Sequence, residues 1–145
     1  MVVAWAMRSM LFYHLVWTTR VRAPLIDLEG ARFLCRVLRS MAQENRAELL
    51  EIGMVSTHVH LLVRAQPLTD MPRMIGRMKG ATSRIAKRDL IAPLSWADGY
   101  DLESVSPGDE MKLRHYLRAQ PFRHPTEAID GWEGDTYAMS GTKRG

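Results

Sequence analysis

The stretch Ser56-Thr57-His58-Val59-His60-Leu61-Leu62-Val63-Arg64 decides the fold, because it has the composition of a strand that carries two histidines. Side chains alternate between the two faces of a strand, so His58 and His60 project to the same side. The aliphatic residues project to the other side and can pack a core: Val59, Leu61 and Val63. Two imidazoles on one strand are typical of a metal site that takes a third ligand from elsewhere, or of a polar pair on a solvated sheet.

Length and composition indicate one globular domain. The chain has 145 residues, of which 46% are hydrophobic and 25% are charged, as in ordinary soluble domains. Its single cysteine, Cys35, excludes an internal disulfide and a cysteine-rich zinc site. The net charge of +4 favours an anionic partner without identifying it.

No segment has the pattern of a membrane or export signal. Every apolar run is shorter than the roughly 20 residues that span a bilayer. The apolar start, residues 1–7, lacks a basic region and a small-residue cleavage site. We therefore expect a cytoplasmic protein without membrane contact.

Three elements are expected before and beside the histidine strand. An aromatic and β-branched strand covers Leu11–Thr19, and it contains His14, which is either a neighbour of the pair across the sheet or a packed structural histidine. An amphipathic helix follows the N-cap Asp27 and runs to about Asn45. The next strand, Ala47–Val55, alternates so that its apolar face holds Leu50, Ile52 and Met54, and it should form an antiparallel hairpin with the histidine strand.

A second helix is expected from the cap at Asp70 to about Arg88. Its methionines recur at core spacing, whereas its basic residues lie away from that stripe. This basic ridge either tracks phosphates or is a solvated face, and we predict DNA binding by Arg73, Arg77, Lys79 and Arg84.

A last strand at Gly99–Val105 completes the order βαββαβ, which predicts an α+β, ferredoxin-like antiparallel sheet with both helices on one face and the other face open. A further helix should begin at Ser106-Pro107 and stop by Pro121. Because Tyr116 and Gln120 are four residues apart, they would share one face of this helix and could offer a nucleophile and a metal ligand to the histidine pair. The segment 125–145 lacks periodicity and is expected to be a partly flexible tail.

Several short motifs, in this order, resemble those of one enzyme family. They are Tyr13-His14-Leu15-Val16-Trp17, His58-Val59-His60-Leu61-Leu62-Val63, Lys79-Gly80 with Ser83-Arg84, then Trp96, Gly99-Tyr100, Ser104-Val105 and Tyr116-Leu117-Arg118-Ala119-Gln120. The chain resembles the HUH single-tyrosine transposases of the IS-two-hundred-like insertion sequences, with REP-associated tyrosine transposases as relatives. The resemblance extends from about Phe12 to His124, which makes residues 1–124 the expected transposase domain.

The resemblance implies a mechanism and a set of residues. His58, His60 and Gln120 would bind a divalent cation, Mg²⁺ or Mn²⁺, and Tyr116 would attack single-stranded DNA to give a 5′-phosphotyrosine. It also implies a homodimer in which the tyrosine helix of one subunit can serve the histidines of the other. Thr57 stands where the family commonly has Asp or Asn, and Pro121 directly follows Gln120.

Two residue assignments and two functional alternatives remain open in the sequence, and one of these alternatives is a small metal-binding protein whose histidine pair is structural. Tyr116 is favoured as nucleophile over Tyr100, which lies in a strand, and His115 and His124 could contact DNA or simply be surface residues. A non-catalytic module that binds single-stranded nucleic acid on an open ferredoxin-like sheet would also use aromatic and basic residues.

Overall fold

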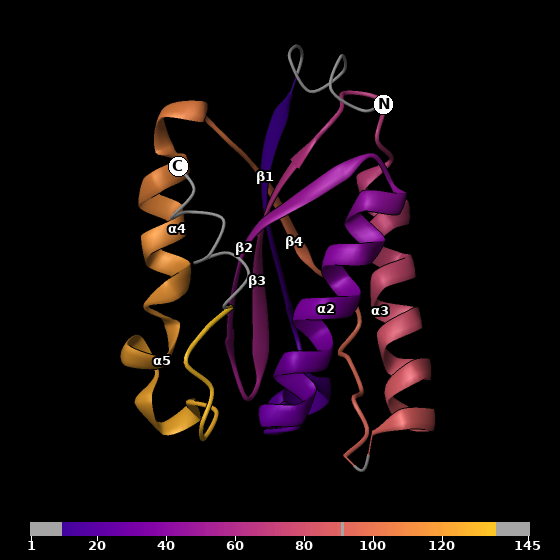
Figure 1. Cartoon of the computed structure of the whole chain (residues 1–145), viewed down its shortest axis with the longest axis vertical. Coiled ribbons are helices and arrows are strands. Elements are labelled where there is room, and N and C mark those ends of the chain that lie inside the picture. The colour runs from indigo at the N-terminus through magenta and orange to yellow at the C-terminus, as the bar shows by residue number, and fades with distance from the viewer. Residues whose placement is uncertain (1–9, 91, 136–145) are drawn as a thin grey trace.

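An antiparallel sheet with helices on both of its faces forms the body of the protein (Figure 1). The computed structural model describes residues 10–90 and 92–135. The strands are β1 (Leu11–Thr18), β2 (Ala47–Val55), β3 (His58–Ala65) and β4 (Asp101–Val105). The α-helices are α2 (Leu28–Glu44), α3 (Met71–Asp89), α4 (Glu110–Arg118) and α5 (Gln120–Arg123).

The strand order is β2-β3-β1-β4, and every neighbouring pair is antiparallel. This order and the two helices on one face confirm the predicted α+β, ferredoxin-like architecture. The histidine strand β3 occupies the middle of the sheet, with Val16 of β1 opposite His60 and Gly53 of β2 on the other side. A central strand is held on both edges, so its side chains have fixed positions.

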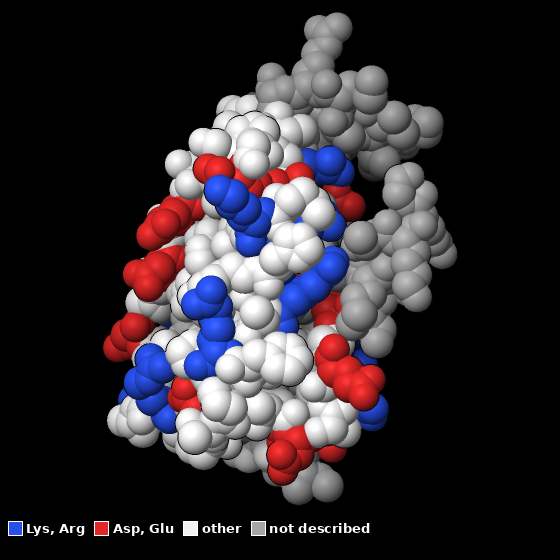
Figure 2. Space-filling model, turned by 90° about the vertical axis from the view of Figure 1, so that its left-hand side faces the viewer, with Lys and Arg blue, Asp and Glu red and all other residues white. Residues whose placement is uncertain are grey.

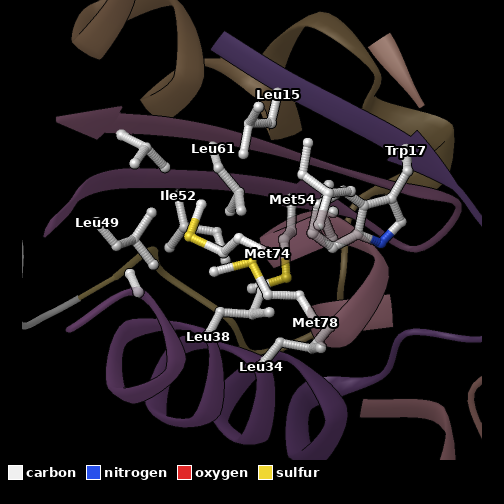
Figure 3. Packing of buried hydrophobic residues seen from close by; sticks show 14 of the residues in the cluster. Leu15, Trp17, Leu34, Leu38, Leu49, Ile52, Met54, Leu61, Met74 and Met78 are labelled. Atoms are coloured by element: carbon white, nitrogen blue, oxygen red, sulfur yellow. The ribbon is translucent and has the colours of Figure 1, made fainter. Parts of the chain in front are cut away.

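The hydrophobic core lies between the sheet and the helices α2 and α3 (Figure 3). Asp27 and Asp70 begin these helices as predicted, since each side chain accepts a hydrogen bond from a backbone N–H of the first turn. Methionines of α3 interleave with leucines of α2 beneath the strands, as Met74 and Leu38 show in Figure 3. Val59 and Leu61 face this core, so the histidines of the same strand face away from it.

The prediction that Leu50 of β2 faces the core was wrong. A β-bulge shifts the register between Leu49 and Glu51, so Leu49 joins Ile52 and Met54 in the core, whereas Leu50 was expected there. One extra residue in a strand reverses the alternation for everything before it. The bulge also turns Glu51 to the histidine face, where it is buried.

The expectation that the second face of the sheet is open was also wrong. Helix α4 packs against β2 and β3 on that face, and its Leu117 is fully buried. The helix comes very close at Gly53, where an added Cβ would lie 2.3 Å from the carbonyl oxygen of Leu117. Only glycine allows this contact between the backbone of the helix and the strand.

The helix that carries Tyr116 was expected as a single helix that stops by Pro121, but in the structure it is divided into two. It begins with a 3-10 turn at Pro107–Asp109 after Ser106, runs as α4 to Arg118, and breaks at Ala119 before the short α5. Pro121 lies in the first turn of α5, where its missing N–H costs nothing. Tyr116 and Gln120 therefore belong to two different helices, although they were expected on one.

Residues 125–135 return to the sheet. Ile129 is buried in the core, and the backbone N–H of Ser56 donates to the carbonyl of Glu127 at 2.7 Å. The tail was expected to be partly flexible over residues 125–145. Its last part, residues 136–145, lies outside the described residues. No helix within the described ranges is long and apolar enough to cross a membrane.

Candidate active site

The His58 and His60 rings lie side by side on the face of the sheet that α4 covers. Their centroids are 5.1 Å apart, and the residues are 6% and 8% exposed. Burial is the main cause that lowers the pKa of both imidazoles, in His60 to about 3. Both rings are therefore neutral at physiological pH, which is the form that binds a metal ion.

His14 is the direct neighbour of His60. The rings stack with their centroids 5.2 Å apart, and Nε2 of His14 lies 3.0 Å from Nδ1 of His60 in a hydrogen bond. Burial also lowers the pKa of His14, so the pair shares one hydrogen between two neutral rings. The sequence left two interpretations of His14 open, and both are correct: it is a neighbour of the histidine pair and it is a hydrogen-bonded structural residue. This hydrogen bond occupies Nδ1 of His60, so Nε2 is the ring nitrogen of His60 that the contact with His14 does not use.

His58 is held by a hydrogen-bond chain that ends on a carboxylate. Its Nδ1 lies 3.0 Å from Oγ1 of Thr57, and the Thr57 hydroxyl donates to Oε1 of Glu127 at 2.6 Å. The hydrogen bond from Thr57 is the largest of the causes that lower the pKa of Glu127. Sequence patterns could not reveal this contact, because 70 residues separate its two ends.

The Tyr116 ring stands edge-on to the histidine pair within the same chain. Its centroid is 5.9 Å from that of His60, at an interplanar angle of 84°. The guanidinium carbon of Arg123 lies 4.7 Å from the Tyr116 ring centroid, over the ring. An arginine at this position contacts the aromatic face and brings positive charge to the phenol.

Gln120 completes the group of side chains that the sequence had placed together. It is fully buried, and its Oε1 lies 3.4 Å from Nε2 of His58. Its Nε2 has no hydrogen-bond partner among the described residues, which is unusual for a buried amide. Within those residues no three His, Cys, Asp or Glu side chains are arranged to hold a metal ion. Two neutral imidazoles and a buried amide oxygen are nevertheless donors of the kind that a divalent cation accepts.

His124 also reaches this group of side chains, although its own side chain is 41% exposed. Its ring centroid is 5.5 Å from that of His58, and its Nδ1 lies 3.8 Å from Oε2 of Glu127. The break at Ala119 turns the chain so that residues 123–127 come back to β3. His115, by contrast, is exposed on α4.

Helix α4 is fixed to the sheet by an ion pair. Arg118 approaches Oε1 of Glu51 to 2.9 Å through its Nη2, and Glu51 is 1% exposed. Burial is the largest cause that raises the pKa of Glu51, while the Arg118 hydrogen bond opposes it. The pair holds the helix two residues beyond Tyr116.

The basic residues predicted to bind DNA lie on the other side of the molecule. Arg73, Arg77 and Arg84 are exposed on α3 and line a groove with Gly76 and Gly80. Helix α3 packs on the core face, so this groove and Tyr116 are on opposite sides of the sheet. Lys79 instead donates to the carbonyls of Ala97 and Gly99 at 2.7 and 2.6 Å.

A ferredoxin-like sheet with a histidine pair facing a tyrosine helix is the arrangement that the sequence resemblance implied for a DNA transposase. A family model described as "Transposase IS200 like" matches residues 7–120. The chain belongs to this IS200-like transposase family.

Known relatives agree with this assignment. The ISDra2 transposase TnpA of Deinococcus radiodurans is 30% identical over 115 residues, covering 74% of this chain and 82% of the relative. A crystal structure of a protein from Deinococcus radiodurans R1, classed as a transposase, superposes with a TM-score of 0.62 at 28% identity, over 77% of this chain and 91% of the other. A REP-associated tyrosine transposase bound to a REP hairpin shares the fold, with a TM-score of 0.63 at 12% identity, over 81% of this chain and 69% of that one.

Proposed function

We propose that this transposase cuts and rejoins single-stranded DNA through a covalent bond between Tyr116 and a 5′ phosphate, with the help of a divalent metal ion. The observation that carries the proposal is the 5.9 Å approach of the Tyr116 ring to His60, beside a buried Gln120. These side chains come from β3, α4 and α5, and only the fold brings them together.

The chemistry follows from what each side chain can do. The Tyr116 hydroxyl gives its proton to solvent as its oxygen attacks the phosphorus, the bond from phosphorus to the 3′ oxygen breaks, and the released oxygen takes up a proton from solvent to become a 3′ hydroxyl. The phosphotyrosine bond retains the energy of the broken bond, so rejoining by a 3′ hydroxyl needs no nucleotide cofactor. Arg123, over the Tyr116 ring, brings positive charge to the position where the phosphate must arrive.

His58, His60 and Gln120 are the residues that would hold Mg²⁺ or Mn²⁺. When bound, such an ion polarises the phosphate and stabilises negative charge on its oxygens. Nitrogen ligands favour Mn²⁺ over Mg²⁺, which prefers oxygen, so we expect stronger binding of Mn²⁺ in vitro.

The partner in this proposal is single-stranded DNA at hairpin-containing element ends. A relative with the same fold is bound to a REP hairpin, which supports this class of substrate. Figure 2 looks onto the α4 side and shows Lys and Arg side chains across its middle, with Asp and Glu mostly towards the margins. Arg73, Arg77 and Arg84 offer phosphate contacts on the far side. In the proposed homodimer, each subunit would carry one site, and Tyr116 would serve the histidines of its own chain.

The test is a covalent capture experiment. The protein is incubated with Mn²⁺ and a labelled single strand that carries candidate element ends, and the mixture is separated under denaturing conditions. We expect a shifted band in the wild-type protein and its loss in Tyr116→Phe, with Tyr100→Phe as the matched control that retains it. A module that only binds DNA would give no shifted band in any of the three proteins.

A further inference from the structure

The contact between Thr57 and Glu127 controls how His58 presents its nitrogen atoms. Glu127 is a carboxylate at neutral pH and can only accept hydrogen bonds. The Thr57 hydroxyl therefore directs its one hydrogen to Glu127, at 2.6 Å. Its oxygen can then only accept from Nδ1 of His58, which lies 3.0 Å away.

This direction of hydrogen bonding fixes the tautomer of the imidazole. A neutral ring that carries its hydrogen on Nδ1 has a lone pair on Nε2. The Nε2 atom of His58 points at Oε1 of Gln120 at 3.4 Å, which is long for a hydrogen bond between them. Two lone pairs facing each other at this distance suit a shared cation better than a direct contact.

The position of Glu127 is determined by more than its side chain. Its backbone carbonyl accepts from the N–H of Ser56 at 2.7 Å, and Ile129, two residues further, is buried in the core. Thr57 is itself only 4% exposed. Thr57 is therefore fixed by its burial in the β2–β3 turn, and Glu127 is fixed by its backbone hydrogen bond to Ser56 in the same turn.

We propose that Thr57 and Glu127 act as positioning residues, a relay that holds His58 in the Nδ1–H tautomer and so keeps its Nε2 free for the metal ion. This inference rests on the proposed function for the role of the metal. Outer hydrogen bonds of this kind typically change metal affinity 10- to 100-fold. It assigns to Glu127, which comes after the last motif of the family resemblance, a part in the site.

The experiment reads the tautomer directly, without metal or DNA. Long-range ¹H–¹⁵N correlation spectra of the full chain with ¹⁵N-labelled histidine distinguish protonated from unprotonated ring nitrogens. We expect His58 to be protonated on Nδ1 in the wild type, in Thr57→Ser, which keeps a hydroxyl, and in Glu133→Ala, a matched exposed glutamate. Thr57→Val and Glu127→Ala should both lose this preference, and Mn²⁺ binding measured by titration calorimetry should weaken about 10-fold or more in each.

The relay is overturned if wild-type His58 carries its hydrogen on Nε2, or if Glu127→Ala keeps the wild-type spectrum or the wild-type Mn²⁺ affinity. Glu127 is only partly buried, so this variant tests the inference even where Thr57→Val fails to fold. The spectra also separate this inference from the proposed function. An Nδ1–H tautomer without any DNA adduct would contradict the function alone, and an adduct with the other tautomer would contradict the relay alone.

Discussion

The ring of Tyr116 meets the ring of His60 edge-on at 5.9 Å within a single chain. The family resemblance had implied that a tyrosine helix can serve the histidines of another subunit, and the sequence gives no means of deciding between the two arrangements. In this structure the strand β3 and the helix α4 of one chain bring both groups together. The contacts that hold α4 on the sheet are therefore the first to test.

One of these contacts is the packing of Leu117 against Gly53. An added Cβ would lie 2.3 Å from the Leu117 carbonyl oxygen and 2.8 Å from its carbon, so the helix must move away. We expect Gly53→Ala to destabilise the protein by about 1–3 kcal/mol in urea unfolding, as overpacking does, and to reduce DNA cleavage.

Gly80→Ala is the matched control for that substitution. Apart from the adjoining residues and the backbone of its own helix, no atom lies within 4 Å of a Cβ added at Gly80, which is in the interior of α3. Alanine should stabilise this helix by roughly 0.5–1 kcal/mol. Equal effects at Gly53 and Gly80 would contradict the close packing of α4 on β2.

Replacing either partner of the ion pair between Arg118 and Glu51 should lower the free energy of unfolding by a different amount. Arg118→Ala leaves a carboxylate that is 1% exposed without this donor, and we expect a loss of about 1–3 kcal/mol in thermal or urea unfolding. Glu51→Gln keeps an acceptor for the arginine and should cost less. If Glu51→Gln were the more destabilising of the two, the pair would not be what fixes α4.

Much of this arrangement could be predicted, because it depends on local periodicity. The alternation around His58, the caps at Asp27 and Asp70 and the tight β2–β3 connection each have a signal within a few residues. The bulge after Leu49 could not be predicted, since packing against α4 decides it, whereas Pro121 predicted the end of the helix but not the short α5 that follows the break at Ala119. The approaches of His124 and Glu127 to His58 depend on that break, and no pattern in the sequence connects residues so far apart.

The groove on α3 offers a separate test of DNA binding. Arg77 is exposed and lies across the sheet from Tyr116, so Arg77→Ala should weaken DNA affinity without changing the rate of the bound complex. Loss of one phosphate contact should also reduce the slope of log affinity against log salt by about 0.7 for a single strand. Arg88→Ala is the control, because Arg88 lies on the same helix and pairs with Asp89. An unchanged salt slope in Arg77→Ala would remove this residue from the DNA contact.

Cys35 gives a prediction for alkaline pH. Burial is the main cause that raises the pKa of its thiol from 9.0 to about 12. The unfolded chain loses this proton near pH 9 and the folded chain keeps it, so the stabilisation is complete below pH 9 and is lost as the pH rises towards 12. By pH 10 the wild type should have lost about 1 kcal/mol relative to Cys35→Ala in urea unfolding, compared with their difference at pH 7. A pH-independent difference would show that the thiol is not protected in the folded state.

The central claim is that Tyr116 forms the bond to DNA, and mass spectrometry of the covalent adduct tests it most directly. Trypsin cleaves after Arg114 and Arg118, so Tyr116 lies in a peptide of residues 115–118 that contains no other tyrosine. After nuclease and trypsin digestion, this peptide should carry the mass of a 5′-linked nucleotide. A nucleotide on the peptide of Tyr13, Tyr100 or Tyr137, with residues 115–118 unmodified, would contradict the account.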